Sequence, residues 1–135
     1  MSTYPEPPAP VPVRKGWLAY AATMLVIAGA FNIVHGITAL GNGDYFTSSK
    51  LVFANMDVWG WIFLGWGVLQ AAAGLGVVRR RASAPMLGVA VAGIGAIIWF
   101  FFLFAAPWAG LLGAFLNLSV VYGLTAGYGE AWPDR

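Results

Sequence analysis

Three carboxamide side chains interrupt the long apolar runs of this sequence: Asn32, Gln70 and Asn117. Each lies near the middle of a separate run, so all three fall at a similar depth if the runs are helices that cross a membrane. Such amides could form a polar site for a small ligand or ion. They could also bond only to one another across helices, at ~0.6 kcal/mol per bond. We favour the second interpretation and keep the first as a hypothesis.

The only histidine, His35, lies one helical turn after Asn32. An imidazole in an apolar segment could carry a proton, bind one axial position of a haem or bond to a quinone head group. It could also bond to a neighbouring backbone carbonyl or to Asn117, which is the interpretation that we favour. A metal site needs three or four protein ligands, so one histidine is a poor basis for it. We therefore expect no metal and no cofactor.

Other catalytic chemistry is missing from the sequence. It has no cysteine, no Ser–His–Asp set, no phosphate-binding loop and no pair of acids. No carboxylate lies within an apolar run, which disfavours a proton-coupled pump. These absences predict a protein that is not an enzyme.

Aromatic residues are concentrated toward one end of the apolar runs. Tryptophan and tyrosine favour the membrane interface, so an aromatic belt accounts for many of them. A pocket for a lipid, quinone or polyene is the alternative, with Trp61 and Trp99 among its walls and Asn32 or His35 as the polar contact. The aromatic residues in question are Trp59, Trp61, Trp66, Trp99, Phe100, Phe101, Phe102, Phe104 and Trp108.

The elements that position these residues follow from composition. Hydrophobic residues make up 60% of the 135 residues and charged residues only 9%, whereas a soluble domain is about a quarter charged. This excludes a soluble enzyme, a disordered chain and a nucleic-acid binder. About 20 residues of helix cross a ~30 Å hydrocarbon core. The sequence therefore predicts an all-α integral membrane four-helix bundle, with spans at about residues 16–40, 58–78, 86–106 and 108–128.

Basic residues predict the orientation of these spans. Cytoplasmic loops carry an excess of lysine and arginine, which places both termini inside the cell (N-in/C-in) and the protein in the cell membrane. The basic residues that anchor this topology are Arg14, Lys15, Arg79, Arg80 and Arg81. The segments outside the spans are a proline-rich cytoplasmic arm (1–15), an outer loop (41–57), a cytoplasmic loop (79–85) and a cytoplasmic tail (129–135).

Small residues recur at helical spacing and predict where the helices pack. In lipid, small residues let two helix backbones approach closely. On the first span the expected inner face contains Ala21, Leu25, Ala28, Asn32, His35 and Ala39. On the later spans the predicted packing residues are Gly60, Gly67, Gly74, Gly88, Ala92, Gly95 and Gly110.

Several short motifs carry a resemblance to a known family. They are Gly16-Trp17, Asn32-Ile33-Val34-His35-Gly36, Trp59-Gly60-Trp61, Pro107-Trp108 and the segment from Asn117 to Leu124. Over residues 16–128 the chain resembles a family of small four-helix membrane proteins of actinobacteria that is known only as a domain of unknown function. The resemblance implies the topology and the lineage, and it implies no activity.

The role that we expect is that of an accessory or scaffold subunit in a larger membrane complex. Small size, small-residue stripes, the missing catalytic set and a proline-rich arm suited to docking all favour it. Its partners would be the lipid bilayer and a second protein or a second copy of the chain, and not nucleic acid. The alternative is a binder or carrier of a hydrophobic small molecule in an outer-leaflet aromatic pocket. A transporter or channel built by an oligomer is disfavoured by the uncharged spans.

Overall fold

The computed structural model describes residues 16–41 and 56–128. They form the helices α1 (Trp17–Gly41), α2 (Met56–Val78), α3 (Ala84–Phe102) and α4 (Pro107–Ala126). All four are long and apolar enough to cross a membrane, so the prediction of an all-α fold with four such helices is confirmed. The predicted arm and tail, most of the outer loop, and the anchors Arg14 and Lys15 lie outside the described residues.

Most helix boundaries lie within two residues of the sequence prediction, and one differs by four residues. Helix α3 ends at Phe102, four residues before the predicted end of its span, because the chain must reverse direction before Pro107. The turn is made by backbone bonds from Ala105 and Ala106 to the Phe102 carbonyl, at 3.1 and 2.8 Å. These turn residues are apolar, so hydropathy alone does not separate them from the helix. Helix α2 begins at Met56, two residues before the predicted start of its span, so Asp57 lies in its first turn.

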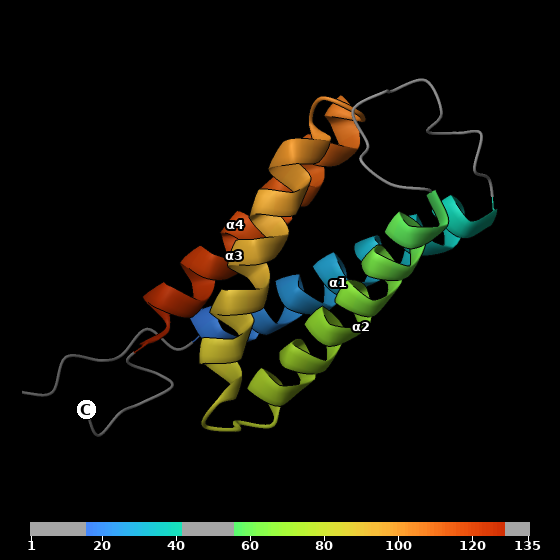
Figure 1. The fold of residues 1–135 in the computed structure, drawn as a ribbon. Helices are drawn as coiled ribbons and strands as arrows, with labels where there is room; N and C mark the ends of the chain where they lie inside the picture. The colour runs from blue at the N-terminus through green and yellow to red at the C-terminus, as the bar shows by residue number, and fades with distance from the viewer. Residues whose placement is uncertain (1–15, 42–55, 129–135) are drawn as a thin grey trace, which may run out of the picture.

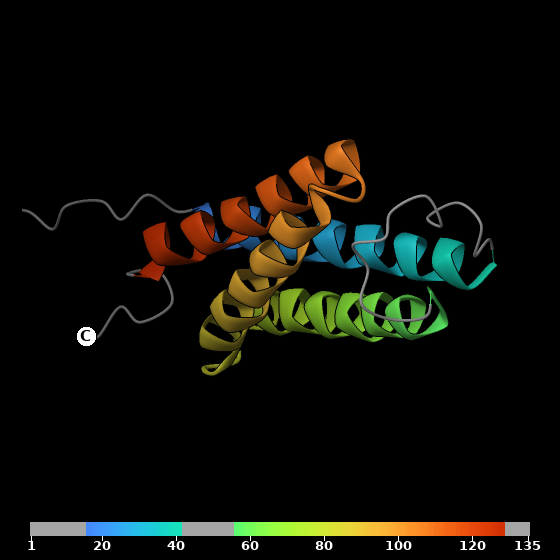
Figure 2. The same cartoon turned by 45° about the horizontal axis from the view of Figure 1, so that its top comes forward.

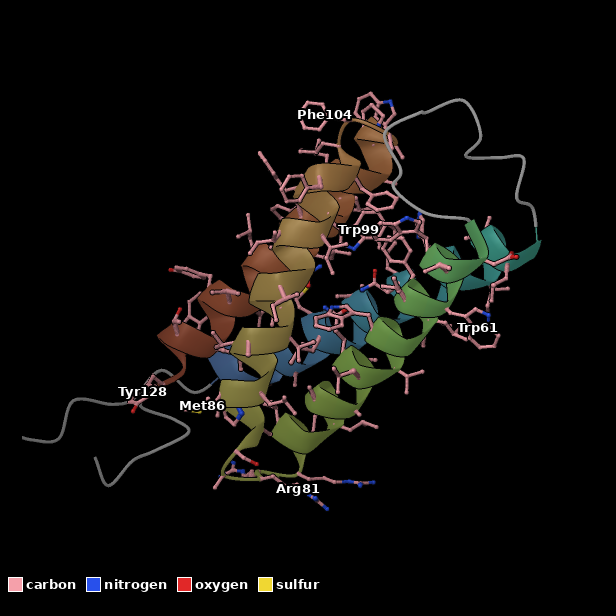
Figure 3. The ribbon with its side chains drawn as sticks, viewed as in Figure 1. Trp61, Arg81, Met86, Trp99, Phe104 and Tyr128 are labelled. Carbon is pink, nitrogen blue, oxygen red and sulfur yellow. The ribbon has the colours of Figure 1, made fainter. Side chains whose placement is uncertain are left out.

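The helices form antiparallel hairpins that cross at an angle. Helix α1 packs most extensively on α2, and α3 on α4, while the α1–α4 and α2–α3 interfaces are smaller. Figure 1 shows the hairpin of α1 and α2 and the hairpin of α3 and α4 close together at one end and apart at the other. In Figure 2 α1 and α2 run side by side over the part of α1 that α3 and α4 do not cover. In Figure 3, Arg81 and Tyr128 lie away from the end that carries Phe104.

The α1–α2 interface is built from small residues that face one another every seven positions. A Cβ atom on Gly36 would lie 2.8 Å from the Gly60 carbonyl oxygen, and one on Gly29 would lie 2.6 Å from the Gly67 carbonyl oxygen. The backbones therefore touch without side chains between them, as close packing in lipid requires. The facing pairs are Ala22 with Gly74, Gly29 with Gly67, and Gly36 with Gly60.

The remaining predicted packing residues, Gly88, Ala92, Gly95 and Gly110, are also buried. A Cβ atom on Gly88 would lie 2.7 Å from a methyl group of Leu124, and one on Gly110 would lie 2.7 Å from the Leu103 nitrogen. Large apolar side chains such as Trp108 and Met86 cover the outside and are mostly exposed. A surface of this kind suits contact with lipid and not with water.

Helix α2 ends in a turn that normally contains glycine. The Arg81 N–H bonds to the Gly76 carbonyl at 3.1 Å and the Arg80 N–H bonds to the Val77 carbonyl at 3.0 Å. This is the Schellman pattern, in which the residue at the position of Arg80 is left-handed and is usually glycine. The backbone of Arg80 is in the left-handed conformation, with φ of 52°. This conformation costs a residue other than glycine about 1 kcal/mol.

We expect Arg80→Gly to raise the free energy of unfolding by about 1 kcal/mol, because glycine removes the left-handed strain. Reversible unfolding in mixed detergent micelles would measure this. Arg79→Gly, one residue earlier, is the control, and it should not stabilise the protein. A destabilised Arg80→Gly variant would mean that the arginine side chain contributes more than its backbone conformation costs.

Candidate functional site

One chain of hydrogen bonds joins all four helices at the centre of the protein. The Trp99 indole Nε1 on α3 donates to Asn32 Oδ1 on α1 at 2.9 Å. Asn32 Nδ2 then donates to Gln70 Oε1 on α2 at 2.5 Å. Gln70 Nε2 donates to Asn117 Oδ1 on α4 at 2.6 Å, and Asn117 Nδ2 donates to the carbonyl of Gly113 at 2.8 Å. We call this set the polar chain.

The side chains of the polar chain are fully enclosed by protein. Asn32 and Gln70 are 0% exposed, and Asn117 and Trp99 are 1% exposed. Each carboxamide in the chain donates one bond and accepts one bond. Buried polar groups that are satisfied internally need no ligand. The contacts therefore match the interhelical bonding that the sequence favoured for these amides.

Two glycines, Gly95 and Gly113, make room for side chains of the polar chain because they have no Cβ atom. A Cβ atom on Gly113 would overlap the indole ring of Trp99, and one on Gly95 would overlap the carboxamide of Asn117. Gly95 had been expected only to let helices approach, yet it also makes room for a polar side chain. Because both positions face buried groups that cannot move into open space, the polar chain and the glycine pattern are one structural unit.

His35 is outside the polar chain. Its Nδ1 is 2.9 Å from the carbonyl oxygen of Phe31, and a carbonyl can only accept, so this nitrogen carries the proton. Of the two bonds that the sequence suggested for His35, the one to a backbone carbonyl is formed and the one to Asn117 is not. In a neutral ring of this tautomer Nε2 is an acceptor, and no described residue bonds to it.

His35 belongs to a cluster of aromatic rings directly beside the polar chain. Its ring meets the Trp99 ring edge-on, with centroids 5.1 Å apart. The Trp99 ring also lies 5.0 Å from Phe63, and Phe63 lies 5.0 Å from Phe102. Trp59 completes the cluster, 5.1 Å from Phe102. Trp99 thus contacts His35 with its ring and Asn32 with its N–H group.

A small pocket opens among these rings, in the angle between the hairpins where Figure 3 shows Trp99. Its volume is about 310 Å³ with the open space at its mouth, and its closed part has room for about one water-sized group. All four helices contribute to it. The lining residues are His35, Ala39, Trp59, Phe63, Trp99, Phe102, Ala106 and Ala109.

One of the residues that line the pocket, Trp59, has an unpaired hydrogen-bond donor. Its indole Nε1 is buried and has no hydrogen-bond partner, whereas buried indole N–H groups usually find one. The Nε1 of Trp66 is in the same state, but Trp66 does not line the pocket. The sequence named Trp59 only among many aromatic residues, because its spacing does not distinguish it from those that face outward.

The structure separates the residues that the sequence grouped as one candidate ligand site. Trp99 and His35 line the pocket. Asn32, Gln70 and Asn117 lie in the polar chain and are bonded to one another. Trp61 is 63% exposed and does not line the pocket. Of the nine aromatic residues that the sequence singled out, only Trp59, Trp99 and Phe102 line the pocket.

These features define a class: an all-α protein of four membrane-length helices, held by a buried polar chain, with an aromatic pocket beside it. The family model for a domain of unknown function, DUF7144, matches residues 17–129. The chain therefore belongs to this family, as the resemblance implied. Searches of curated proteins and of solved structures gave no match.

Proposed function

We propose that the chain is a non-enzymatic multi-pass protein of the cell membrane whose aromatic pocket binds one end of a lipophilic small molecule. Positive-inside counting supports an orientation with both termini and the arginine loop in the cytoplasm. In that orientation the pocket lies toward the outer leaflet, since Trp99, which lines it, is on the side away from Arg81 (Figure 3).

The observation that carries this proposal is an apolar pocket that opens among aromatic rings of all four helices. Ligand sites are mostly apolar, with a few polar groups that orient the ligand. Here the lining is almost wholly apolar and comes from rings and alanines. Two of the lining residues, His35 and Trp59, each carry a ring nitrogen to which no described residue bonds. The polar chain, by contrast, has every carboxamide paired, so we assign it to the stability of the fold.

An accessory subunit of a membrane complex is the second candidate. Its support is a pair of glycines on the outside of the bundle: a Cβ atom on Gly65 or on Gly93 would meet nothing within 4 Å. Positions of this kind could receive a helix of a protein partner or of a second copy. We rank this role below ligand binding because small residues on a helix face do not by themselves specify a partner.

Native mass spectrometry of the protein, extracted in mild detergent from its own cells, tests both proposals. The expected result is a bound molecule of a few hundred daltons that Ala109→Phe removes, because a phenyl ring at this lining position fills the pocket. Ala90→Phe, on the exposed side of α3, is the control and should keep the ligand. A second polypeptide in the complex would establish the accessory role. Protein with neither would contradict both.

A further inference from the structure

The turn between α2 and α3 concentrates positive charge. Arg79, Arg80 and Arg81 follow the last residue of α2, and all three are exposed. The only carboxylate among the described residues is that of Asp57, in the first turn of α2, about 30 Å away along the helix. At that distance it cannot pair with the arginines. Three positive charges therefore lie together without a counter-charge from the described part of the chain.

The side chains of this turn are rich in hydrogen-bond donors. A guanidinium group has five N–H donors and no acceptor, and its planar fork matches two oxygens of a phosphate group. Ser83, in the same turn, is exposed and makes no capping bond to α3, so its hydroxyl is also available to donate. A ligand that satisfies this turn must bring negative charge and several acceptor oxygens, as a phosphate group does.

Apolar residues flank the arginines on both helices. Val78, the last residue of α2, is 65% exposed, and Met86, in the first turn of α3, is 75% exposed. Leu75 extends this apolar surface along α2. Figure 3 shows Met86 and Arg81 at the end of the bundle away from Phe104. Because these helices suit a hydrocarbon core, the arginines lie where that core gives way to the lipid head groups.

The charged turn and its apolar flanks match the two parts of a phospholipid. We propose that the turn between α2 and α3 binds an anionic phospholipid, with the phosphate group on the arginines and the acyl chains against Val78 and Met86. A free phosphate or an acidic peptide would meet the charge but leave the apolar flanks without a partner. The inference is independent of the aromatic pocket, which lies toward the other end of α2, beside Trp59.

Phosphatidylglycerol and phosphatidylcholine with the same acyl chains are the probes, because only their head groups differ. The full chain is placed in nanodiscs that contain equal amounts of the two lipids, and native mass spectrometry measures which lipid stays bound. We expect phosphatidylglycerol to be retained about 10-fold or more over phosphatidylcholine, since each arginine near an anionic membrane surface contributes a factor of about 5. Equal retention of the two lipids would overturn the proposal.

Arg80 offers a variant that is expected to fold well. Arg80→Gly removes one charge and relieves the left-handed backbone, so it should lower the preference for phosphatidylglycerol about 5-fold while it stabilises the protein. Arg80→Lys is the matched control, because it keeps the charge at the same position, and it should keep the preference. An unchanged preference in Arg80→Gly would contradict the role of the arginines. Ala109→Phe, which fills the aromatic pocket, should leave the preference unchanged, so the two sites are tested separately.

Two further probes distinguish the lipid from other anions. Glycerol phosphate carries the phosphate of the lipid without its acyl chains, and hexaglutamate carries the charge of an acidic peptide. Neither should displace phosphatidylglycerol from the protein. Displacement by glycerol phosphate would assign the turn to a free phosphate, and displacement by hexaglutamate would assign it to an acidic protein partner. Either result would overturn the lipid assignment.

Discussion

Gly67→Ala is expected to destabilise the protein by about 2–3 kcal/mol, as overpacking of a tight interior does. A Cβ atom at this position would lie 2.5 Å from the Gly29 carbonyl oxygen and 2.8 Å from the Ile33 nitrogen. Both are backbone atoms of α1, so a rotamer change cannot relieve the contact. The helices must separate, and they form the largest interface of the fold.

Gly65→Ala provides a matched control two residues away on the same helix. A Cβ atom on Gly65 would meet nothing within 4 Å, and alanine is the better helix former by up to about 1 kcal/mol. We therefore expect Gly65→Ala to be neutral or slightly stabilising. Reversible unfolding in mixed micelles, followed by helicity, measures both variants. Similar effects of the two substitutions would contradict the glycine-mediated α1–α2 contact.

The glycine contacts show which part of the helix packing could be predicted from the sequence. The seven-residue spacing of Gly60, Gly67 and Gly74 is visible in one helix, so their packing role was predicted. Their partners Gly29 and Gly36 were missed, because the facing stripe depends on the register between two helices. Periodicity describes one helix at a time and does not contain that register.

The candidate site was predictable in part for the same reason. The sequence identified the three amides and His35, because polar groups in apolar runs stand out. It did not identify Trp99 as the first donor of the polar chain, or Trp59 as an unpaired donor. Tryptophan is common at membrane interfaces, so composition gives no sign of which indole turns inward. The packing of the four helices places Trp99 at the centre and Trp61 on the outside.

The polar chain predicts an unusual result for combined substitutions. Gln70→Met should leave Asn32 Nδ2 and Asn117 Oδ1 without hydrogen-bond partners. Asn32→Leu should leave Trp99 Nε1 and Gln70 Oε1 without partners. Each single substitution is expected to cost about 1–3 kcal/mol, since a buried group without a partner loses its solvation. The double variant strands only Trp99 Nε1 and Asn117 Oδ1, so it should cost about as much as either single one.

A double-mutant cycle, measured by unfolding in mixed micelles, distinguishes the ways in which the chain could stabilise the fold. If the number of buried groups without a partner determines the loss of stability, the double variant loses as much unfolding free energy as a single variant. If lost bonds set it, the double variant costs about half as much again, because it breaks three bonds where each single variant breaks two. Ser119→Ala is the control, since Ser119 bonds only to the Leu116 carbonyl of its own helix; it should have little effect. Fully additive costs would mean that Asn32 and Gln70 act independently, which is incompatible with a direct bond between them.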